Sequence, residues 1–299
     1  MEIIQFRLGD KLDSYPDLVL CLGFFDGVHL GHQSLIKKAR KEGYKLGVLS
    51  FNSSPAYVMG YKTSDMCITS ISDKADLFED MGVDYFFIMD FDKEVMKATK
   101  DEFIDKVLLP INPTQVVCGP DYRFGVRAEG DPTYLKRYFN VKVIDFENYQ
   151  NQKISSRNII DLIKSGKMEI VTEMLGRPYR INGTVMVGLK NGKKIEFPTA
   201  NLSLEYEYIY PKVGVYIGYG IVFGRKYKAI INVGTHPTVS PLSQPIIEVH
   251  LLDFDENLYG KNIFVEFVRY IRDEMKFENL EELKKQLNKD KQKAKKLLQ

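Results

Sequence analysis

The sequence contains few of the residues that build disulfide frameworks or metal clusters. Its 299 residues include three cysteines, four histidines and no tryptophan. Cys21, Cys67 and Cys118 are odd in number and widely spaced, and two of them lie in apolar runs. We therefore expect neither a disulfide framework nor a zinc site, and we expect a reducing compartment.

An excess of charge of one sign and a long apolar run are also missing. The chain has 42 Lys+Arg against 40 Asp+Glu, a formal net charge of +2. This balance gives no reason to expect nucleic acid or an anionic membrane as the main partner. No segment approaches the roughly 20 apolar residues of a membrane span, and the N-terminus lacks the pattern of a signal peptide. We expect a globular, cytoplasmic protein with room for two modest domains.

The first half of the chain alternates strand-like and helix-like segments. Apolar runs predict strands at 18–22, 46–51, 84–89, 115–118 and 141–146. Between them, Ser72 is a plausible N-cap of one helix, and the capping-box pair Thr99 and Glu102 opens another that runs to Pro110. Strands separated by helices are typical of a parallel sheet in a doubly wound α/β domain, which we expect over residues 1–176.

The pattern changes after a helical stretch over 158–175 that breaks near Gly166. Short strands then follow at 181–187, 215–219, 227–233, 246–252 and 263–268. Turns separate them, including the hairpin signal Asn191-Gly192. This spacing is typical of a small antiparallel β-barrel, which we expect over residues 177–299. Asn279 and Glu282 have the spacing of a helix cap, so a helix should close the chain.

A glycine-rich segment follows the first long apolar run. Residues 23–32 read GFFDGVHLGH and contain two of the four histidines. Glycine lets the backbone approach a polyphosphate closely, and the helix expected from about Gly31 aims free N–H groups at it. His29 and His32 are three residues apart, so both rings can face one point and donate to phosphate oxygens. A tight turn with incidental histidines is the alternative, but we favour a nucleotidyl-transfer site for ATP.

Residues 29–32 (HLGH) resemble the His-x-Gly-His motif of the nucleotidylyltransferase superfamily. Residues 25–32 (FDGVHLGH) resemble the adenylyltransferase module of bacterial bifunctional riboflavin kinase/FAD synthetases. Residues 119–125 (GPDYRFG) and 153–156 (KISS) match two further blocks of that family. The resemblance implies a Rossmann-like FMN adenylyltransferase domain in which His29 and His32 stabilise charge on the transferred phosphate. It also implies nucleotide- and phosphate-binding roles for Gly23, Phe25, Asp26, Gly27, Gly31, Asp121, Ser156 and Arg157.

The block that begins at residue 153 departs from the family pattern in its second half. Arg157 stands where the family has Thr, and Ile160 stands where it has Arg. The family's Thr and Arg help to hold the nucleotide phosphates, and Arg157 could supply the missing positive charge from a neighbouring position. The alternative is a plain helix N-cap at Ser155 or Ser156, and the two interpretations are compatible.

Residues 197–201 (FPTAN) resemble the Pro-Thr-Ala-Asn signature of riboflavin kinases. A threonine hydroxyl and an asparagine amide suit Mg²⁺ beside nucleotide phosphates, so the resemblance assigns the metal to Thr199 and Asn201. Gly183 and Gly188 precede the signature at family spacing and would form a flap over phosphates. Glu196 departs from the family's Gly, and a carboxylate is unfavourable near polyphosphate.

Glu248 is the predicted general base of the kinase. The 5′-hydroxyl of riboflavin must lose a proton as it attacks the γ-phosphate of ATP, and a carboxylate can accept that proton. Alternation along its strand puts Glu248 and His250 on one face. From the sequence alone, the favoured interpretation of Glu248 is an exposed strand carboxylate with no catalytic role. The resemblance to riboflavin kinases reverses that preference. Arg272 is predicted to contact flavin, or else to pair with Asp273 or Glu274.

The sequence therefore predicts a two-domain enzyme that uses ATP and Mg²⁺ to make FMN from riboflavin and FAD from FMN. Its expected partners are these small molecules, and no oligomeric state is predicted. Three alternatives remain: a riboflavin kinase with a degenerate adenylyltransferase half, a different nucleotidylyltransferase such as one acting on a pantetheine phosphate, and a non-catalytic flavin sensor.

Overall fold

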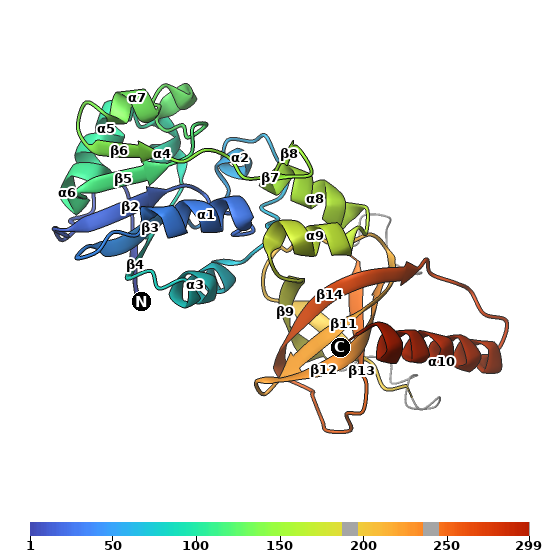
Figure 1. Ribbon diagram of the computed structural model, residues 1–299. Coiled ribbons are helices and arrows are strands. Elements are labelled where there is room, and N and C mark those ends of the chain that lie inside the picture. Colours follow the sequence, from blue (N-terminus) through green and yellow to red (C-terminus); the bar gives the residue numbers. More distant parts are fainter. Residues whose placement is uncertain (187–196, 236–244, 299) are drawn as a thin grey trace. The chain divides into compact units, whose positions relative to one another are not determined.

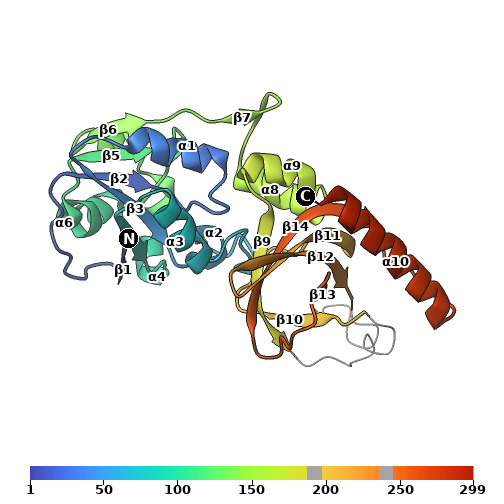
Figure 2. The same cartoon turned by 60° about the horizontal axis from the view of Figure 1, so that its bottom comes forward.

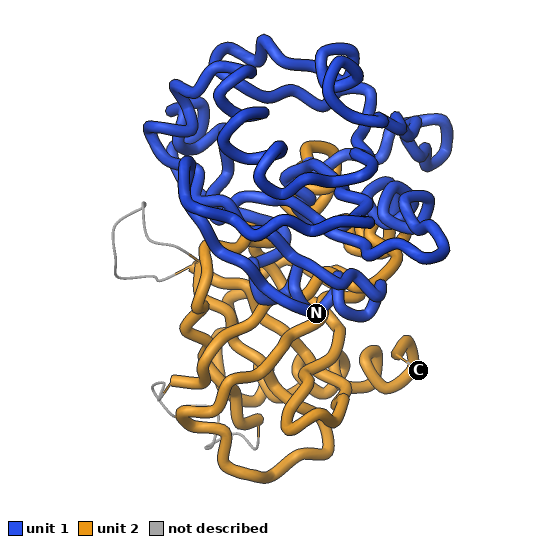
Figure 3. Tube along the Cα trace, turned by 90° about the vertical axis from the view of Figure 1, so that its left-hand side faces the viewer, with its two compact units in different colours: residues 1–156 blue, residues 157–299 orange. Residues whose placement is uncertain are grey.

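The computed structural model describes residues 1–186, 197–235 and 245–298. The chain forms two compact units, Met1–Ser156 and Arg157–Gln299, which Figure 3 distinguishes by colour. All three cysteines lie in the described part of the first unit and are free thiols, with Cys21 and Cys118 buried. Within the described residues, no helix is both long and apolar enough to cross a membrane.

The first unit contains a six-stranded parallel sheet in the order β1-β4-β3-β2-β5-β6 (Figure 1). Its strands are β1 (Glu2–Phe6), β2 (Leu18–Leu22), β3 (Lys45–Phe51), β4 (Tyr85–Met89), β5 (Gln115–Cys118) and β6 (Asn140–Val143). The helices are α1 (Leu30–Ala39), α2 (Pro55–Val58), α3 (Ile71–Asp80), α4 (Lys93–Lys97), α5 (Lys100–Phe103), a π-helical segment Ile104–Leu108, α6 (Leu109–Ile111), the 3₁₀ turn Val126–Ala128 and α7 (Pro132–Leu135). A short hairpin, β7 (Asn148–Tyr149) and β8 (Gln152–Lys153), follows β6.

The central strand β2 is buried on both faces because helices cover both sides of the sheet. Its side chains alternate, so Val19 and Cys21 pack toward α1 and α3, while Leu18, Leu20 and Leu22 pack toward α4, α5 and the helical turns after it. The strand is consequently a continuous apolar run, as its sequence indicated. The predicted doubly wound α/β fold is confirmed.

Several boundaries differ from the prediction. The edge strand β1 was not predicted because four of its five side chains are exposed or half-buried, so its sequence lacks an apolar run. The N-cap of α3 is Ser70 rather than Ser72: Ser70 Oγ accepts from the amide of Asp73 at 3.0 Å, and the Asp73 carboxylate accepts from the Ser70 amide at 3.3 Å. Strand β6 ends at Val143, short of the predicted 146.

The predicted capping box of Thr99 and Glu102 is confirmed at the start of α5. The helical stretch it opens continues past Pro110 and ends at Ile111. The turn before this proline is π-helical, and the Leu109 amide donates to the Ile104 carbonyl five residues back.

The second unit is a closed antiparallel barrel, with three helices among its described residues. Its strand order is β10-β13-β12-β11-β14-β9. The strands are β9 (Tyr179–Met186), β10 (Ala200–Leu204), β11 (Gly214–Val222), β12 (Arg225–Gly234), β13 (Ile246–Leu251) and β14 (Asn262–Arg272). Helices α8 (Ser156–Lys164) and α9 (Met168–Leu175) precede the barrel, and α10 (Leu280–Leu297) follows it.

The barrel separates an apolar interior from a partly covered outer face. Ile247 and Val249 of β13 are buried opposite Val233 and Ile231 of β12. On the outer face, Ala294 of α10 packs with apolar residues of β11 and β12, and Figure 2 shows α10 beside these strands. The predicted barrel, the closing helix with its Asn279 cap and the break at Gly166 are confirmed.

Strand β10 was not predicted, because the sequence signature that precedes it resembled only a turn. The hairpin signal Asn191-Gly192 lies outside the described residues.

The corrected cap of α3 can be tested by two serine substitutions. Ser70→Ala removes the capping oxygen and should lower the unfolding free energy of the first unit by about 1 kcal/mol. Ser72→Ala, two residues further along the chain, should lower the unfolding free energy by less than about 0.5 kcal/mol. Urea unfolding of the full chain measures both, and a larger loss for Ser72→Ala would contradict the assignment.

Candidate functional site

A cavity of about 470 Å³ lies at the carboxyl edge of the parallel sheet in the first unit. The strand order reverses between β2 and β5, so the loops after these two strands lead away on opposite sides. Doubly wound sheets bind ligands at this reversal, outside the carboxyl ends of the strands. The lining agrees with that position, since it includes Gly23 after β2, Gly119 after β5 and Ile144 after β6.

The segment after β2 forms a tight turn with left-handed backbone. The φ angles of Phe25, Gly27 and Val28 are 53°, 83° and 39°. The Asp26 carboxylate accepts from the amides of Ile68 and Thr69 at 2.9 and 3.2 Å, and the Gly27 amide donates to Thr69 Oγ1 at 2.8 Å. Burial raises the pKa of Asp26, and the positive charge of Lys74 opposes that rise. Asp26 and Gly27 therefore hold the turn, and neither lines the cavity.

His29 and His32 converge at the start of α1, as their spacing predicted. Their rings are stacked with centroids 3.6 Å apart and planes 16° apart, and both line the cavity. His29 is the N-cap, and its Nδ1 accepts from the His32 amide at 3.3 Å. A Cβ on Gly31 would lie 3.1 Å from His29 Cε1, which is tighter than usual, so a side chain there would require the His29 ring to shift.

The surroundings of His32 favour its neutral form, and burial contributes most. Burial is the largest cause that lowers the pKa of His32 well below its usual range, and the charges of His29 and Lys74 add to it. A neutral imidazole has one N–H to donate, which is the group that a phosphate oxygen accepts from.

Of the other residues predicted for this site, some line the cavity and one does not. Phe25, Asp121 and Ser156 line the cavity; the Asp121 carboxylate is 2.7 Å from Lys153 Nζ, and Ser156 Oγ donates to the Asp26 carbonyl at 2.8 Å. Arg157 is exposed and is the first residue of the second unit.

Sequence reasoning missed three basic residues at or beside the site, Arg123 and Lys153 in the cavity lining and Lys74 behind the turn. Lys153 lines the cavity, and its place at the start of the matched block was the signal for it. Lys74 lies behind the turn, where its Nζ donates to the Phe24 carbonyl at 2.8 Å. The signal for Lys74 was its position three residues after Ile71 and four before Phe78, on the apolar face of α3.

In the second unit, the strand register places two predicted site residues and one further polar residue side by side in one row on neighbouring strands. Glu248 of β13 is the partner of Asn201 on β10 and of Asn232 on β12. Opposed residues share a face, and Asn232 Nδ2 donates to Glu248 Oε2 at 3.5 Å. Since Val249 faces the interior, Glu248 faces outward, and so does His250, which confirms that the two share one face.

His250 has a structural contact with the signature that precedes β10. Its Nδ1 lies 2.8 Å from the Pro198 carbonyl oxygen, and its ring is 4.9 Å from that of Phe197. Burial is the largest cause that lowers the pKa of His250. This contact links strand β13, which carries Glu248, to the residues around Thr199.

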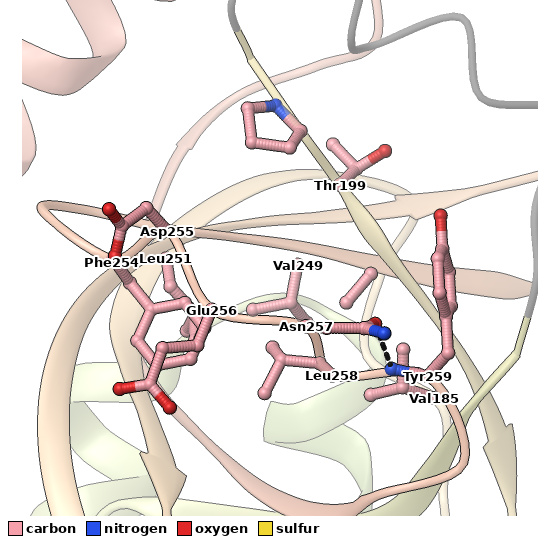
Figure 4. Close-up of a pocket in the computed structure, with 12 residues that line it drawn as sticks. Val185, Thr199, Val249, Leu251, Phe254, Asp255, Glu256, Asn257, Leu258 and Tyr259 are labelled. Atoms are coloured by element: carbon pink, nitrogen blue, oxygen red, sulfur yellow. Dashed lines mark hydrogen bonds between the residues drawn. The ribbon is translucent and has the colours of Figure 1, made fainter.

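Thr199 lines a second cavity of about 570 Å³, drawn in Figure 4. One wall consists of barrel side chains such as Val185 and Val249. The loop after β13 and the signature segment around Thr199 contribute the other residues. In that loop, the Tyr259 amide donates to Asn257 Oδ1 at 3.0 Å. Asn201 and Glu248 are not among the lining residues, so the outward-facing row is not part of this cavity.

Arg272 is engaged by α10. Its Nε and Nη2 donate to Asp290 Oδ2 at 3.0 and 2.8 Å, and Asp290 is fully buried. The ion pair is therefore with Asp290 rather than with Asp273 or Glu274, although the Asp273 carbonyl accepts from Arg272 Nη1 at 3.1 Å. Gly183 lies within β9 opposite Leu204, whereas Gly188 and Glu196 are outside the described residues.

Comparison with protein families gives two matches. A family model described as FAD synthetase matches residues 12–158, and a family model described as riboflavin kinase matches residues 175–298. The first match contains the histidine pair and the second contains Thr199, Asn201 and Glu248.

Curated relatives cover both halves together. The chain is 35% identical over 303 residues to the bifunctional riboflavin kinase/FMN adenylyltransferase of Listeria monocytogenes, covering 98% of this chain and 96% of that protein. It is 36% identical over 287 residues to the protein of the same description from Bacillus subtilis, covering 92% and 91%.

Among solved structures, a Streptococcus pneumoniae protein described as a macrolide-efflux protein matches with a TM-score of 0.87 and 29% identity, covering 99% of each chain. This match shows a shared fold over the full length. The two matched domains and the relatives at 35% and 36% identity show that the chain belongs to the family of bifunctional riboflavin kinase/FMN adenylyltransferases and carries both activities.

Proposed function

We propose that the cavity at the carboxyl edge of the first unit is where FMN is adenylated, with His29 and His32 as the catalytic groups. The observation that carries this proposal is the stacked imidazole pair lining that cavity. The first amides of α1 have no acceptor within the helix, so they favour an anion at the same place.

The reaction requires little of the protein beyond positioning and charge stabilisation. A phosphate oxygen of FMN attacks the α-phosphorus of ATP, and the bond from that phosphorus to the oxygen bridging to the β-phosphate breaks. Pyrophosphate leaves with the bond electrons. The FMN phosphate is already anionic, so no general base is needed. The imidazole N–H groups stabilise the charge that develops on the α-phosphate and on pyrophosphate.

For the kinase, we propose that Glu248 removes the proton from the riboflavin 5′-hydroxyl as the hydroxyl oxygen attacks the γ-phosphorus of ATP. The bond from that phosphorus to the oxygen bridging to the β-phosphate breaks, and ADP leaves with the bond electrons. The outward face of Glu248 makes its carboxylate accessible, and the hydrogen bond from Asn232 orients it. The cavity beside Thr199 is the proposed position of the ATP base, since it is partly apolar and adjoins the signature residue.

Mg²⁺ fits the oxygen donors of Thr199 and Asn201. Thr199 directly precedes β10 and Asn201 is the second residue of that strand, and hydroxyl and amide oxygens are ligands that this hard cation accepts. Bound there, Mg²⁺ would neutralise charge on the ATP phosphates.

The other expectations stay predictions. These are the division of the chain after residue 176, the flavin contact of Arg272, the phosphate contacts of Arg157, Gly183 and Gly188, the cytoplasmic location and the lack of a nucleic-acid partner. The family models meet between 158 and 175, whereas the compact units divide after Ser156.

The histidine pair is tested by His32→Ala, with the kinase in the same chain as the control. Removing one stabilising donor should lower kcat for FAD formation from FMN and ATP by about 100-fold. Riboflavin phosphorylation should stay within about twofold of native, because Glu248 belongs to the other unit. Chromatography of the flavins measures both, and native FAD formation would refute the proposed role and support a site elsewhere.

The general base is tested by Glu248→Gln, which keeps the shape and an acceptor for Asn232. FMN formation should fall by about 100-fold or more, since general-base catalysis contributes 10²–10⁴-fold. FAD formation from supplied FMN should not change. Glu281→Gln, on the first turn of α10, is the matched control for the loss of one exposed carboxylate. A native rate of FMN formation in Glu248→Gln would identify a different base.

The metal assignment is tested by titrating Mg²⁺ against kinase activity in Thr199→Ala and Thr199→Ser. Loss of the hydroxyl should raise the Mg²⁺ concentration at half-maximal rate by about tenfold, and serine should restore it. An unchanged Mg²⁺ dependence in Thr199→Ala would exclude this ligand.

A further inference from the structure

Lys74 is a buried lysine that no part of the proposed chemistry uses. It lies on α3 and is 2% exposed. Its Nζ donates to the Phe24 carbonyl at 2.8 Å and lies 4.0 Å from the centre of the Phe24 ring. Lysine is almost never this buried unless it is paired, because the desolvation of an ammonium group is costly. The position therefore needs an explanation beyond packing.

The Phe24 carbonyl has two buried donors. Ser50 Oγ also donates to it, at 2.8 Å, and Ser50 is fully buried. In a trans peptide unit the C=O and the following N–H point in opposite directions, so these donors turn the Phe25 amide away from Lys74. Phe24 and Phe25 line the cavity of the first unit. Within the described residues the Phe25 amide has no recorded acceptor, which leaves it available to a ligand oxygen.

Asp26 is the anionic counterpart of Lys74. Both side chains are buried, and each opposes the effect of burial on the other's pKa, which is raised for Asp26 and lowered for Lys74. Lys74 fixes the residue at the start of the left-handed turn, and Asp26 fixes the turn to the amides of Ile68 and Thr69. The turn is therefore held at Phe24 by a side chain of α3 and at Asp26 by the backbone of the segment before α3.

We infer that Lys74 is a positioning residue of the adenylyltransferase site: its ammonium holds the Phe24 carbonyl inward and places a buried positive charge behind the phosphate-binding turn. The inference rests on the proposed site of FMN adenylation at His29 and His32. Lys74 acts through the backbone and through the charge of its surroundings, without touching substrate.

The charge of Lys74 also acts on His32. The groups that face His32 are the stacked His29 ring, the Phe25 ring at 5.1 Å between centroids, and the Lys74 charge. Among these, His29 and Lys74 disfavour a proton on His32, in addition to burial. Removing the Lys74 charge should therefore raise the pKa of His32 toward its ordinary value of 6.5. A role in packing alone would leave that pKa where it is.

The test uses the full chain with Lys74→Met, which keeps the aliphatic stem and removes the charge and the donor. FAD formation from FMN and ATP should fall by about 10- to 100-fold in kcat, because the turn loses its alignment with the phosphates. The kinase rate should stay native. Lys37→Met, an exposed lysine near the end of α1, is the control and should leave FAD formation unchanged.

NMR titration supplies the independent readout. The chain has four histidines, so the His32 ring resonances can be assigned by comparison with a His32 variant. In Lys74→Met the His32 titration should move to higher pH, and in Lys74→Arg, which keeps the charge, it should stay low.

The outcomes separate the two proposals. Native FAD formation or an unmoved His32 titration in folded Lys74→Met overturns the role of Lys74. If His32→Ala abolishes FAD formation while Lys74→Met does not, the site stands and the role of Lys74 falls. If Lys74→Met fails to fold, the double variant Asp26→Asn/Lys74→Met removes both buried charges, and a His32 pKa that stays at its native value there also overturns the inference.

Discussion

The buried carboxylate of Asp26 accepts hydrogen bonds from the amides of Ile68 and Thr69, and the proposed site of FMN adenylation depends on this contact. The turn after β2 includes the non-glycine residues Phe25 and Val28 in left-handed backbone, and each costs roughly 1–2 kcal/mol. Charged hydrogen bonds in a buried environment offset that strain. Because the turn is fixed, α1 begins where its first amides and the stacked His29 and His32 rings meet the cavity.

The kinase half achieves its alignment differently, through strand register. Asn201, Glu248 and Asn232 are neighbours only because β10, β13 and β12 pair in one specific register. A slip of one residue would turn Glu248 into the apolar interior and bring Val249 out. The interior packing of Ile247 and Val249 prevents that slip, so the hydrophobic core of the barrel determines where the proposed base points.

For several residues, the position in the sequence does not predict which residue the side chain contacts. Asp26 belongs to the phosphate-binding motif, yet its side chain holds the turn from behind. Arg272 was expected to find its acidic partner in the adjacent residues, but the partner is Asp290 on α10, far along the chain. Lys74 belongs to no motif, and only its position on the apolar face of α3 distinguishes it. Each of these contacts joins elements that are distant in sequence.

The sequence by itself determined the two-part architecture, the β2–turn–α1 segment with its histidine pair, and the signature around Thr199 and Asn201. The first two depend on local periodicity, glycine backbone freedom and short-range spacing, all of which are present in neighbouring residues, whereas the signature was identified by its resemblance to riboflavin kinases. The tertiary structure alone decided that β1 joins the sheet, that β10 places Asn201 beside Glu248, and that Lys74 lies under the proposed phosphate-binding turn. The reason is physical: strand pairing and burial bring distant segments together, and no short window of sequence contains both partners of such a contact.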